Sequence, residues 1–229
     1  MKETAETAPV PVWDLPVRLC HWSFVVIIPA MWWTAENSEM WWHQRLGMVL
    51  LTLLVFRILW GFVGSSTARF SDFVRGPGTI LAYLRGNRDK AHLGHNPLGA
   101  LSVLALLAAM IAQVSMGLFA GDPFDGATGP LRELVGVMTA DRLTDWHHAF
   151  VWGIAALIAL HLAAITFYAV FKQNDLVSPM LSGVKEAPAQ AEPMNPAPVW
   201  RALLCLAFAA GLAAWIWVGA PPLSAGSAA

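Results

Sequence analysis

The stretch that decides the fold is Asp145-Trp-His-His-Ala-Phe-Val-Trp-Gly-Ile-Ala-Ala-Leu-Ile-Ala-Leu-His161, an apolar run long enough to cross a bilayer. His147 and His161 are fourteen residues apart, which in a helix leaves them about 40° apart on one face and about 21 Å apart along the axis. His148 would lie more than about 100° around the helix from His161. The spacing predicts a helix that supplies one axial ligand to each of two stacked haems. Two interfacial histidines without a ligand role are the alternative.

The composition is that of an integral membrane protein. Of the 229 residues, 57% are hydrophobic and only 13% are charged, and the mean hydropathy is +0.54. A soluble chain would carry about a quarter charged residues. The net charge of −1 gives no general attraction to nucleic acid. The N-terminus is polar and acidic without a small-residue cleavage site, so we expect the first hydrophobic segment to stay as an anchor.

Five segments are long and apolar enough to span the bilayer, and most of the 12 tryptophans lie near their ends, as in an aromatic belt. The predicted spans are 19–35, 41–63, 98–120, 147–171 and 202–219. We therefore predict an all-α integral membrane protein. Its core is a four-helix transmembrane bundle holding two b haems, and a fifth C-terminal transmembrane helix is peripheral because it contains no histidine.

The predicted organisation has five parts. They are a cytoplasmic N-terminal tail (1–18), the di-haem cytochrome domain (19–182), a proline-rich cytoplasmic linker (183–199), the fifth transmembrane helix (200–219) and a periplasmic C-terminal tail (220–229). The prolines of the linker predict an extended segment. A short amphipathic helix is expected at 77–85, lying on the cytoplasmic face.

The loops predict the orientation of the chain. The connection from 64 to 94 is basic, whereas the connections at 36–39 and 122–145 are mostly acidic. The basic residues of the first connection are Arg69, Arg75, Arg85, Arg88 and Lys90. By the positive-inside rule, the N-terminus lies in the cytoplasm and the C-terminus in the periplasm.

Four histidines then fall at two depths. His21 pairs with His161 near the cytoplasmic face, and His43 pairs with His147 near the outer face. Bundles build cofactor sites from inward side chains on facing helices, and a low-spin b haem needs two axial imidazoles. Two histidine pairs, each with one member on the helix that carries His147 and His161, predict two bis-histidine haem sites.

Arginines near these histidines are candidate partners for haem propionates. Arg57 lies fourteen residues after His43, on the same helical face and near the cytoplasmic haem. It would either pair with a propionate or snorkel to the headgroups. Arg18, three residues before His21, is a weaker propionate candidate and also fits a positive-inside anchor.

His95 opens the third span, followed by Pro97, which suits the first turn of a helix. His95 would ligate a haem in place of His21, bond to a propionate or help to bind a quinone headgroup. A plain interfacial histidine is the simpler interpretation.

Several other chemistries are excluded. Without a Cys-x-x-Cys-His motif there is no covalently attached c-type haem, and Cys20 and Cys205 are expected as free thiols. No hydrolase, phosphate-loop or zinc motif occurs. The spans also contain no acidic residue for ion transport.

Several runs of sequence, in this order and spacing, resemble bacterial di-haem b cytochromes, a group that includes cytochrome b561 and the b-type cytochrome subunit of membrane nickel–iron hydrogenases. The runs are VWDLPVRLCHW (12–22), HQRLG (43–47), FRILWGFVG (56–64), RFSDF (69–73), GHNPLG (94–99), and Trp146-His followed by Leu160-His161. The resemblance covers about 12–183. It implies a four-helix bundle with two b haems, ligated by His21, His43, His147 and His161. The extra helix after the proline-rich linker departs from many members.

The resemblance implies electron transfer in the bacterial inner membrane. We expect the two haems to connect a periplasmic redox partner, a c-type cytochrome or a hydrogenase-like protein, to the quinone pool (ubiquinone or menaquinone). The lipid bilayer and quinone would be further partners, and the chain would be a homo-oligomer or a subunit of a complex. The alternatives are a superoxide:quinone oxidoreductase acting alone, and a haem-free membrane anchor or assembly subunit.

Overall fold

The computed structural model describes residues 7–85, 94–121, 127–188, 191–221 and 223. The chain forms two compact units. Unit 1 comprises Met1–His21, Arg57–Ala105 and Ile158–Ala202, and unit 2 comprises Trp22–Phe56, Leu106–Leu157 and Leu203–Ala229. Some charges used to predict the orientation lie outside the described residues, namely Arg88, Lys90, Asp122 and Asp125, as do parts of the predicted tails and linker.

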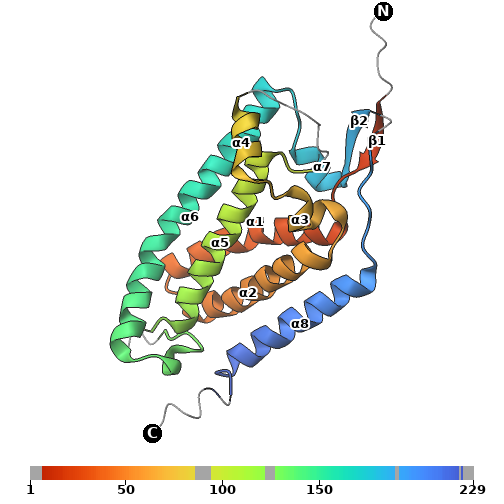
Figure 1. Ribbon diagram of the computed structural model, residues 1–229. Coiled ribbons are helices and arrows are strands. Elements are labelled where there is room, and N and C mark those ends of the chain that lie inside the picture. The colour runs from red at the N-terminus through yellow and green to blue at the C-terminus, as the bar shows by residue number, and fades with distance from the viewer. Residues whose placement is uncertain (1–6, 86–93, 122–126, 189–190, 222, 224–229) are drawn as a thin grey trace, which may run out of the picture. The chain divides into compact units, whose positions relative to one another are not determined.

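Among the residues that the structure describes, five helices are long and apolar enough to cross a membrane, in agreement with the number of predicted spans. They are α1 (Leu15–Glu36), α2 (Met40–Val63), α5 (Pro97–Phe119), α6 (Val137–Phe171) and α8 (Val199–Trp217), drawn in Figure 1. At most 33% of the most apolar part of any of them is buried inside the protein. Such extensive exposed apolar surface is suited to lipid rather than to water.

Helix α1 begins at Leu15, four residues before the predicted start of the span, because Asp14 caps it. The backbone N–H of Val17 donates to Asp14 Oδ1 at 2.8 Å, and Pro16 occupies the first turn. The second carboxylate oxygen of Asp14 accepts from the indole N–H of the buried Trp60 at 2.9 Å. Hydropathy underestimated this helix because its first turns carry the cap and Arg18.

Helix α6 begins at Val137, ten residues before the predicted start of the span at His147. The added turns are polar, but they are packed: Ala140 is fully buried. The hydroxyl of Thr144 donates to Ala140 O at 3.0 Å and accepts from Gly121 N at 3.0 Å. Hydropathy marks where a helix meets lipid, whereas the helix itself continues into the polar region.

The predicted starts of α2 and α5 agree with the structure to within one residue, whereas α8 begins at Val199, three residues before the predicted 202. Pro97 is the first residue of α5, and Asn96 Oδ1 accepts from Gly99 N at 2.7 Å as the cap. The short helix expected at 77–85 is α4 (Pro77–Leu84). Two further short helices of unit 1 are α3 (Phe70–Phe73) and α7 (Val177–Ser182).

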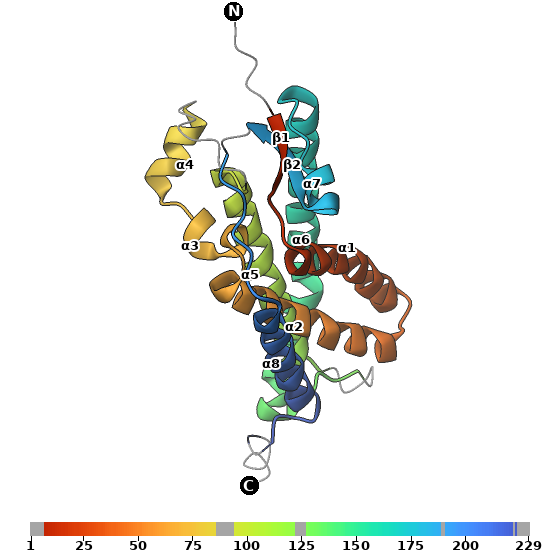
Figure 2. The ribbon, with the colours of Figure 1, turned by 90° about the vertical axis from the view of Figure 1, so that its right-hand side faces the viewer.

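The proline-rich segment is extended as predicted, but it is not a free linker. Residues Val184–Pro188 form strand β2, which pairs antiparallel with β1 (Thr7–Pro11), Thr7 facing Pro188 and Pro11 facing Val184. Both views place this two-stranded sheet beside α7 (Figures 1 and 2). The N-terminal tail and the linker are therefore tied to each other by backbone hydrogen bonds, an addition to the predicted all-α architecture.

Gly183, between α7 and β2, has a left-handed backbone (φ +89°). Its carbonyl accepts from the N–H groups of Val12 and Trp13 at 2.8 and 3.1 Å. A Cβ at this position would lie 2.9 Å from both the carbonyl oxygen of Trp13 and the guanidinium of Arg18. Only glycine fits such a conformation and such a close approach.

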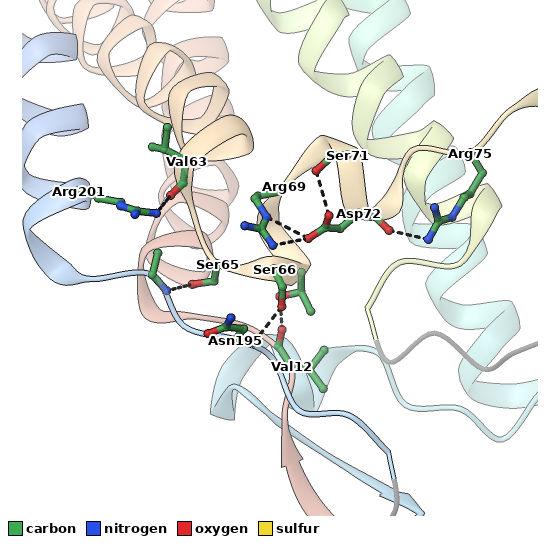
Figure 3. Close-up of polar contacts among 12 residues, drawn as sticks. Val12, Val63, Ser65, Ser66, Arg69, Ser71, Asp72, Arg75, Asn195 and Arg201 are labelled. Atoms are coloured by element: carbon green, nitrogen blue, oxygen red, sulfur yellow. Dashed lines mark hydrogen bonds and ion pairs between the residues drawn. The ribbon is translucent and has the colours of Figure 1, made fainter.

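The segment before α8 is attached to the loop after α2 (Figure 3). The contacts are Ser66 N to Asn195 O (3.0 Å), Asn195 N to Ser66 Oγ (2.9 Å), Ala197 N to Ser65 Oγ (3.0 Å) and Arg201 Nη1 to Val63 O (3.3 Å). Ser65 is 1% exposed, so its bond to Ala197 is protected from water. The start of α8 is therefore fixed within unit 1.

Within unit 2, α8 lies beside α2 in both views (Figures 1 and 2). The buried Ile216, near the end of α8, belongs to a core cluster against which Met48 and Leu51 of α2 pack. Small residues, including Ala209 and Ala213, form the rest of the buried face, and they let the helices approach closely. Cys20 and Cys205 are buried thiols, and neither forms a disulfide with a described residue.

Removing the hydroxyls of Ser65 and Ser66 should release the segment before α8. In the Ser65→Ala/Ser66→Ala variant, the N–H groups of Ala197 and Asn195 lose their acceptors. The loss costs about 1–3 kcal/mol for a buried N–H group, an upper bound for the part-buried Ala197, and less for the exposed Asn195. We expect limited proteolysis between 191 and 198 to accelerate about tenfold in membranes. Ser71→Ala is the matched control, because its hydroxyl bonds only to the neighbouring Asp72 on the surface. Equal cleavage rates in all three proteins would contradict the attachment.

Candidate functional site

The four candidate haem ligands divide two by two between the units. His21 and His161 belong to unit 1, and His43 and His147 belong to unit 2. All four side chains are half-buried, whereas His148 is exposed. The exposure of His148 agrees with the helical-face argument that separated it from His147.

In unit 2, the rings of His43 and His147 face each other across a gap that suits one iron atom. Their ring centres are 6.1 Å apart, and their planes are 89° apart. A metal–nitrogen bond of about 2 Å on either side of one metal, plus roughly 1.1 Å from each nitrogen to its ring centre, gives a separation of about 6 Å. The separation therefore fits two axial imidazoles of a single haem.

The orientation of His147 is fixed by α5. Its Nδ1 lies 3.0 Å from the backbone carbonyl oxygen of Gln113, and the side-chain amide of Gln113 donates to the carbonyl of His147 at 2.9 Å. A carbonyl oxygen only accepts, so Nδ1 carries the proton. The lone pair is then on Nε2, the nitrogen left to bind a metal.

His43 is held in the same way by α1. Its Nδ1 lies 3.0 Å from the carbonyl oxygen of Met31 and 3.3 Å from the hydroxyl of Thr34. Thr34 is 4% exposed and donates its own proton to Met31 O at 2.9 Å. Both rings of the unit 2 pair thus present Nε2 as the free ligand atom.

In unit 1, His161 Nδ1 lies 3.2 Å from the hydroxyl oxygen of Ser102 on α5. His21 and His161 are close enough to interact electrostatically, and His95 is within the same range of both. Two helices, α1 and α6, therefore bring a second pair of imidazoles together.

Both pairs fit a b haem better than a bare metal ion. Among the residues that the structure describes, no group of three or more histidine, cysteine, aspartate or glutamate side chains could hold a metal. An iron porphyrin brings four nitrogens of its own, so two imidazoles with a free Nε2 complete its coordination. When bound, the group would supply reversible one-electron chemistry.

Arg57 lies inside unit 1 rather than at a lipid surface. It is 6% exposed, its guanidinium donates to Ala68 O at 3.4 Å, and its charge centre is 5.4 Å from the ring of Phe70. Asp14 and Cys20 are near enough to act on its charge. Its burial disfavours snorkelling. The prediction that it pairs with a propionate is retained, since a buried guanidinium needs a counter-charge.

Arg18 is directed to the segment between α7 and β2. Its guanidinium donates to the backbone carbonyl of Leu181 and lies against Gly183. These contacts therefore give Arg18 a structural role in attaching α1. Its part as a propionate partner of the haem at His21 stays a prediction.

His95 packs against two aromatic rings. The ring centres of Trp13 and Phe73 are each 4.6 Å from its own. Burial, and to a smaller extent the charge of Arg57, lowers the pKa of His95 to about 3, so the ring is neutral at physiological pH. Its Nδ1 is inaccessible and has no hydrogen-bond partner among the described residues. This setting is more enclosed than that of a plain interfacial histidine, and its role as ligand, propionate partner or quinone contact stays a prediction.

The sequence did not single out the residues that orient the imidazoles, Thr34, Ser102 and Gln113. A weak signal existed, because polar side chains inside apolar spans usually bond to something within the bundle. The spacing of residues along one helix, however, does not tell which imidazole such a side chain faces.

A model of the family described as prokaryotic cytochrome b561 matches residues 12–183. No solved structure shows significant similarity to the chain.

Three relatives are named probable Ni/Fe-hydrogenase B-type cytochrome subunits. That of Bradyrhizobium diazoefficiens is 24% identical over 213 residues, covering 77% of this chain and 86% of the relative. That of Azotobacter chroococcum is 26% identical, covering 80% and 89%. That of Escherichia coli K12, named as the subunit of hydrogenase 1, is 22% identical, covering 76% and 89%. The family match spans well over half of the chain, so this protein belongs to the prokaryotic cytochrome b561 family and is a multi-pass membrane cytochrome of the b type that takes part in electron transfer.

Proposed function

We propose that the chain conducts electrons through two bis-histidine b haems, from a redox protein on the periplasmic side to a quinone in the bacterial inner membrane. One haem is held by His43 and His147, and the other by His21 and His161. The fourteen-residue spacing on the continuous helix α6 sets the ligands about 21 Å apart along the axis. Arg57 would pair with a propionate of the second haem.

The observation that carries the proposal is the state of the imidazoles. His147 and His43 each bond through Nδ1 to a backbone carbonyl, and His161 bonds through Nδ1 to a hydroxyl. The bond to a carbonyl leaves Nε2 of His147 and His43 to bind a metal and makes each ring a stronger ligand, and the Ser102 hydroxyl can accept from Nδ1 of His161 in the same way. Histidines that only face the headgroups would not need these hydrogen bonds within the bundle. The family assignment disfavours a haem-free anchor.

The partner we favour is a hydrogenase-like complex. The relatives compared above are named as subunits of Ni/Fe-hydrogenases, and this chain covers at least 86% of each. A periplasmic c-type cytochrome is the alternative donor. Either partner would leave the haem sites unchanged, because these lie on helices of the matched region.

Substituting the ligands of α6 one at a time should remove one haem at a time. We expect His147→Ala and His161→Ala each to lose about half of the haem of the purified protein, because each removes one axial ligand. Total haem per chain is measured by its pyridine complex. His148→Ala is the control, since His148 is exposed next to His147. Haem loss in His148→Ala with full retention in His147→Ala would refute the assignment.

Gly117 leaves room for the His147 ring. A Cβ at Gly117 would lie 2.9 Å from His147 Cε1 and 3.2 Å from its Nδ1, and the ring cannot withdraw without breaking its bond to Gln113 O. We expect Gly117→Ala to lower the haem content of the unit 2 site at least twofold. Gly153→Ala is the matched control in α6, because nothing lies within 4 Å of its Cβ position, and it should keep both haems. Full haem retention in both variants would show that the ring tolerates the methyl group.

The donor can be identified by purifying the tagged full chain from gently solubilised membranes. A hydrogenase-like partner would add nickel and hydrogen-dependent haem reduction to the preparation. A c-type cytochrome would add a haem that stays attached to its polypeptide in a denaturing gel. We expect the former. Quinone reduction by superoxide with the purified chain alone would instead support the superoxide:quinone oxidoreductase.

A further inference from the structure

We infer that helix α4 rests in the surface of the membrane, and that the arginines at its two ends, Arg75 and Arg85, bind the phosphates of anionic phospholipids. The leaflet concerned is the one next to unit 1, which the predicted orientation makes the cytoplasmic leaflet. The inference rests on the membrane spans and on contacts within unit 1, and it does not depend on the haems.

Helix α4 is an apolar helix that the protein leaves largely uncovered. It contains no charged residue, and none of its described side chains is buried. Leu81 is 47% exposed, and Val74, in the turn before the helix, is 38% exposed. A helix of eight residues is too short to be stable alone in water, so its apolar side chains need a cover. The boundary between lipid headgroups and acyl chains provides one.

A contact between two tyrosines sets the depth of α4 in the membrane. The hydroxyl oxygens of Tyr83 in α4 and Tyr168 in α6 are 2.7 Å apart, and both residues belong to unit 1. Tyr168 lies in the last turn of α6, where the exposed Phe171 is followed by the charged Lys172. This change from apolar to charged side chains marks the edge of the hydrocarbon, and tyrosine is enriched at that level. Helix α4 therefore lies at the level of the lipid headgroups.

The exposed apolar surface of α6 extends up to the same contact. Phe167 and Phe171 are 45% and 72% exposed, and the ring centres of Phe167 and Tyr168 are 6.1 Å apart. The bilayer that covers these rings is the apolar phase nearest to α4. This continuity favours lipid over a separate protein as the cover of α4.

The charges of the two arginines are not neutralised by the protein. Asp72 of α3 forms its ion pair with Arg69, at 2.9 Å. Arg75 donates to the backbone carbonyl of Asp72, also at 2.9 Å, which orients its guanidinium but leaves its charge and further N–H donors for an anion. Among the residues that the structure describes, neither Arg75 nor Arg85 has an ion-pair partner. A phosphate matches a guanidinium, which binds it through two parallel hydrogen bonds.

Arg85 and Leu81 share one face of the chain at α4. Residues four apart on a helix lie on the same face, and both of these side chains are exposed. A phospholipid matches this arrangement, because its acyl chains lie below its phosphate. The apolar stem of Arg85 lies along the surface while its guanidinium stays at the phosphates. The net positive charge of the site selects an anionic headgroup over a zwitterionic one.

The test counts the phospholipids bound to the purified full chain by native mass spectrometry, during titration with phosphatidylglycerol or phosphatidylcholine. We expect the wild-type chain to prefer phosphatidylglycerol. Arg75→Gln/Arg85→Gln should bind phosphatidylglycerol more weakly, by roughly fivefold for each charge removed, with phosphatidylcholine binding unchanged. Arg142→Gln, which changes an exposed arginine of unit 2, is the matched control and should keep the wild-type affinity.

Wild-type affinity in the double variant, or equal affinity of the wild-type chain for both lipids, would overturn the inference. Competition by inorganic phosphate alone would assign the arginines to a free anion, and cross-linking of two chains through Leu81→Cys would assign the exposed face of α4 to a second copy. Either result would also overturn it. If the double variant loses the helix content of the wild type, Arg85→Gln decides alone, since Arg85 is exposed. The haem content should be equal in all variants, so the proposed function is tested separately.

Discussion

The hydrogen bond from an imidazole Nδ1–H to an oxygen of a neighbouring helix is the interaction on which the sites depend. A neutral imidazole has one N–H proton and one nitrogen lone pair, and its hydrogen-bond partners determine which nitrogen carries each. In unit 2, the carbonyls of Met31 and Gln113 fix the proton on Nδ1 of His43 and His147. Because a carbonyl offers only lone pairs, the ring cannot reverse its tautomer without losing the bond.

The bond between His147 and the carbonyl of Gln113 also limits which residues α5 can carry next to that carbonyl. A helical carbonyl points toward the residue four positions later, so the oxygen of Gln113 emerges beside Gly117. The His147 ring reaches that oxygen only if position 117 carries no side chain, because a Cβ there would lie 2.9 Å from the ring. Gly117, the carbonyl of Gln113 and the ring of His147 therefore depend on one another, although they come from two helices.

The sequence predicted those features of the fold and site that depend on a single helix. Periodicity along a single span placed His147 and His161 on one face, with His148 on another, and hydropathy found the five spans. It could not predict contacts between helices, since the rotation of α5 decides whether Ser102 faces His161. Hydropathy also placed the starts of α1 and α6 too late, because the cap at Asp14 and the packed turn at Ala140 are polar or small rather than strongly apolar.

The runs of sequence that carry the family resemblance mark a set of contacts. In the run at 12–22, Trp13 stacks on His95 and Asp14 caps α1. In the run at 94–99, Asn96 caps α5. The run at 69–73 supplies the ring of Phe73, which also packs against His95.

Most of these runs belong to unit 1, whereas the run at 43–47 and Trp146-His147 belong to unit 2. The family model matches 12–183 and so covers the helices of both histidine pairs. Most of α8, which lies beyond the matched region, belongs to unit 2 and packs there on Met48 and Leu51. The C-terminal helix therefore adds packing to the unit that holds His43 and His147, from a part of the chain that the family model does not match.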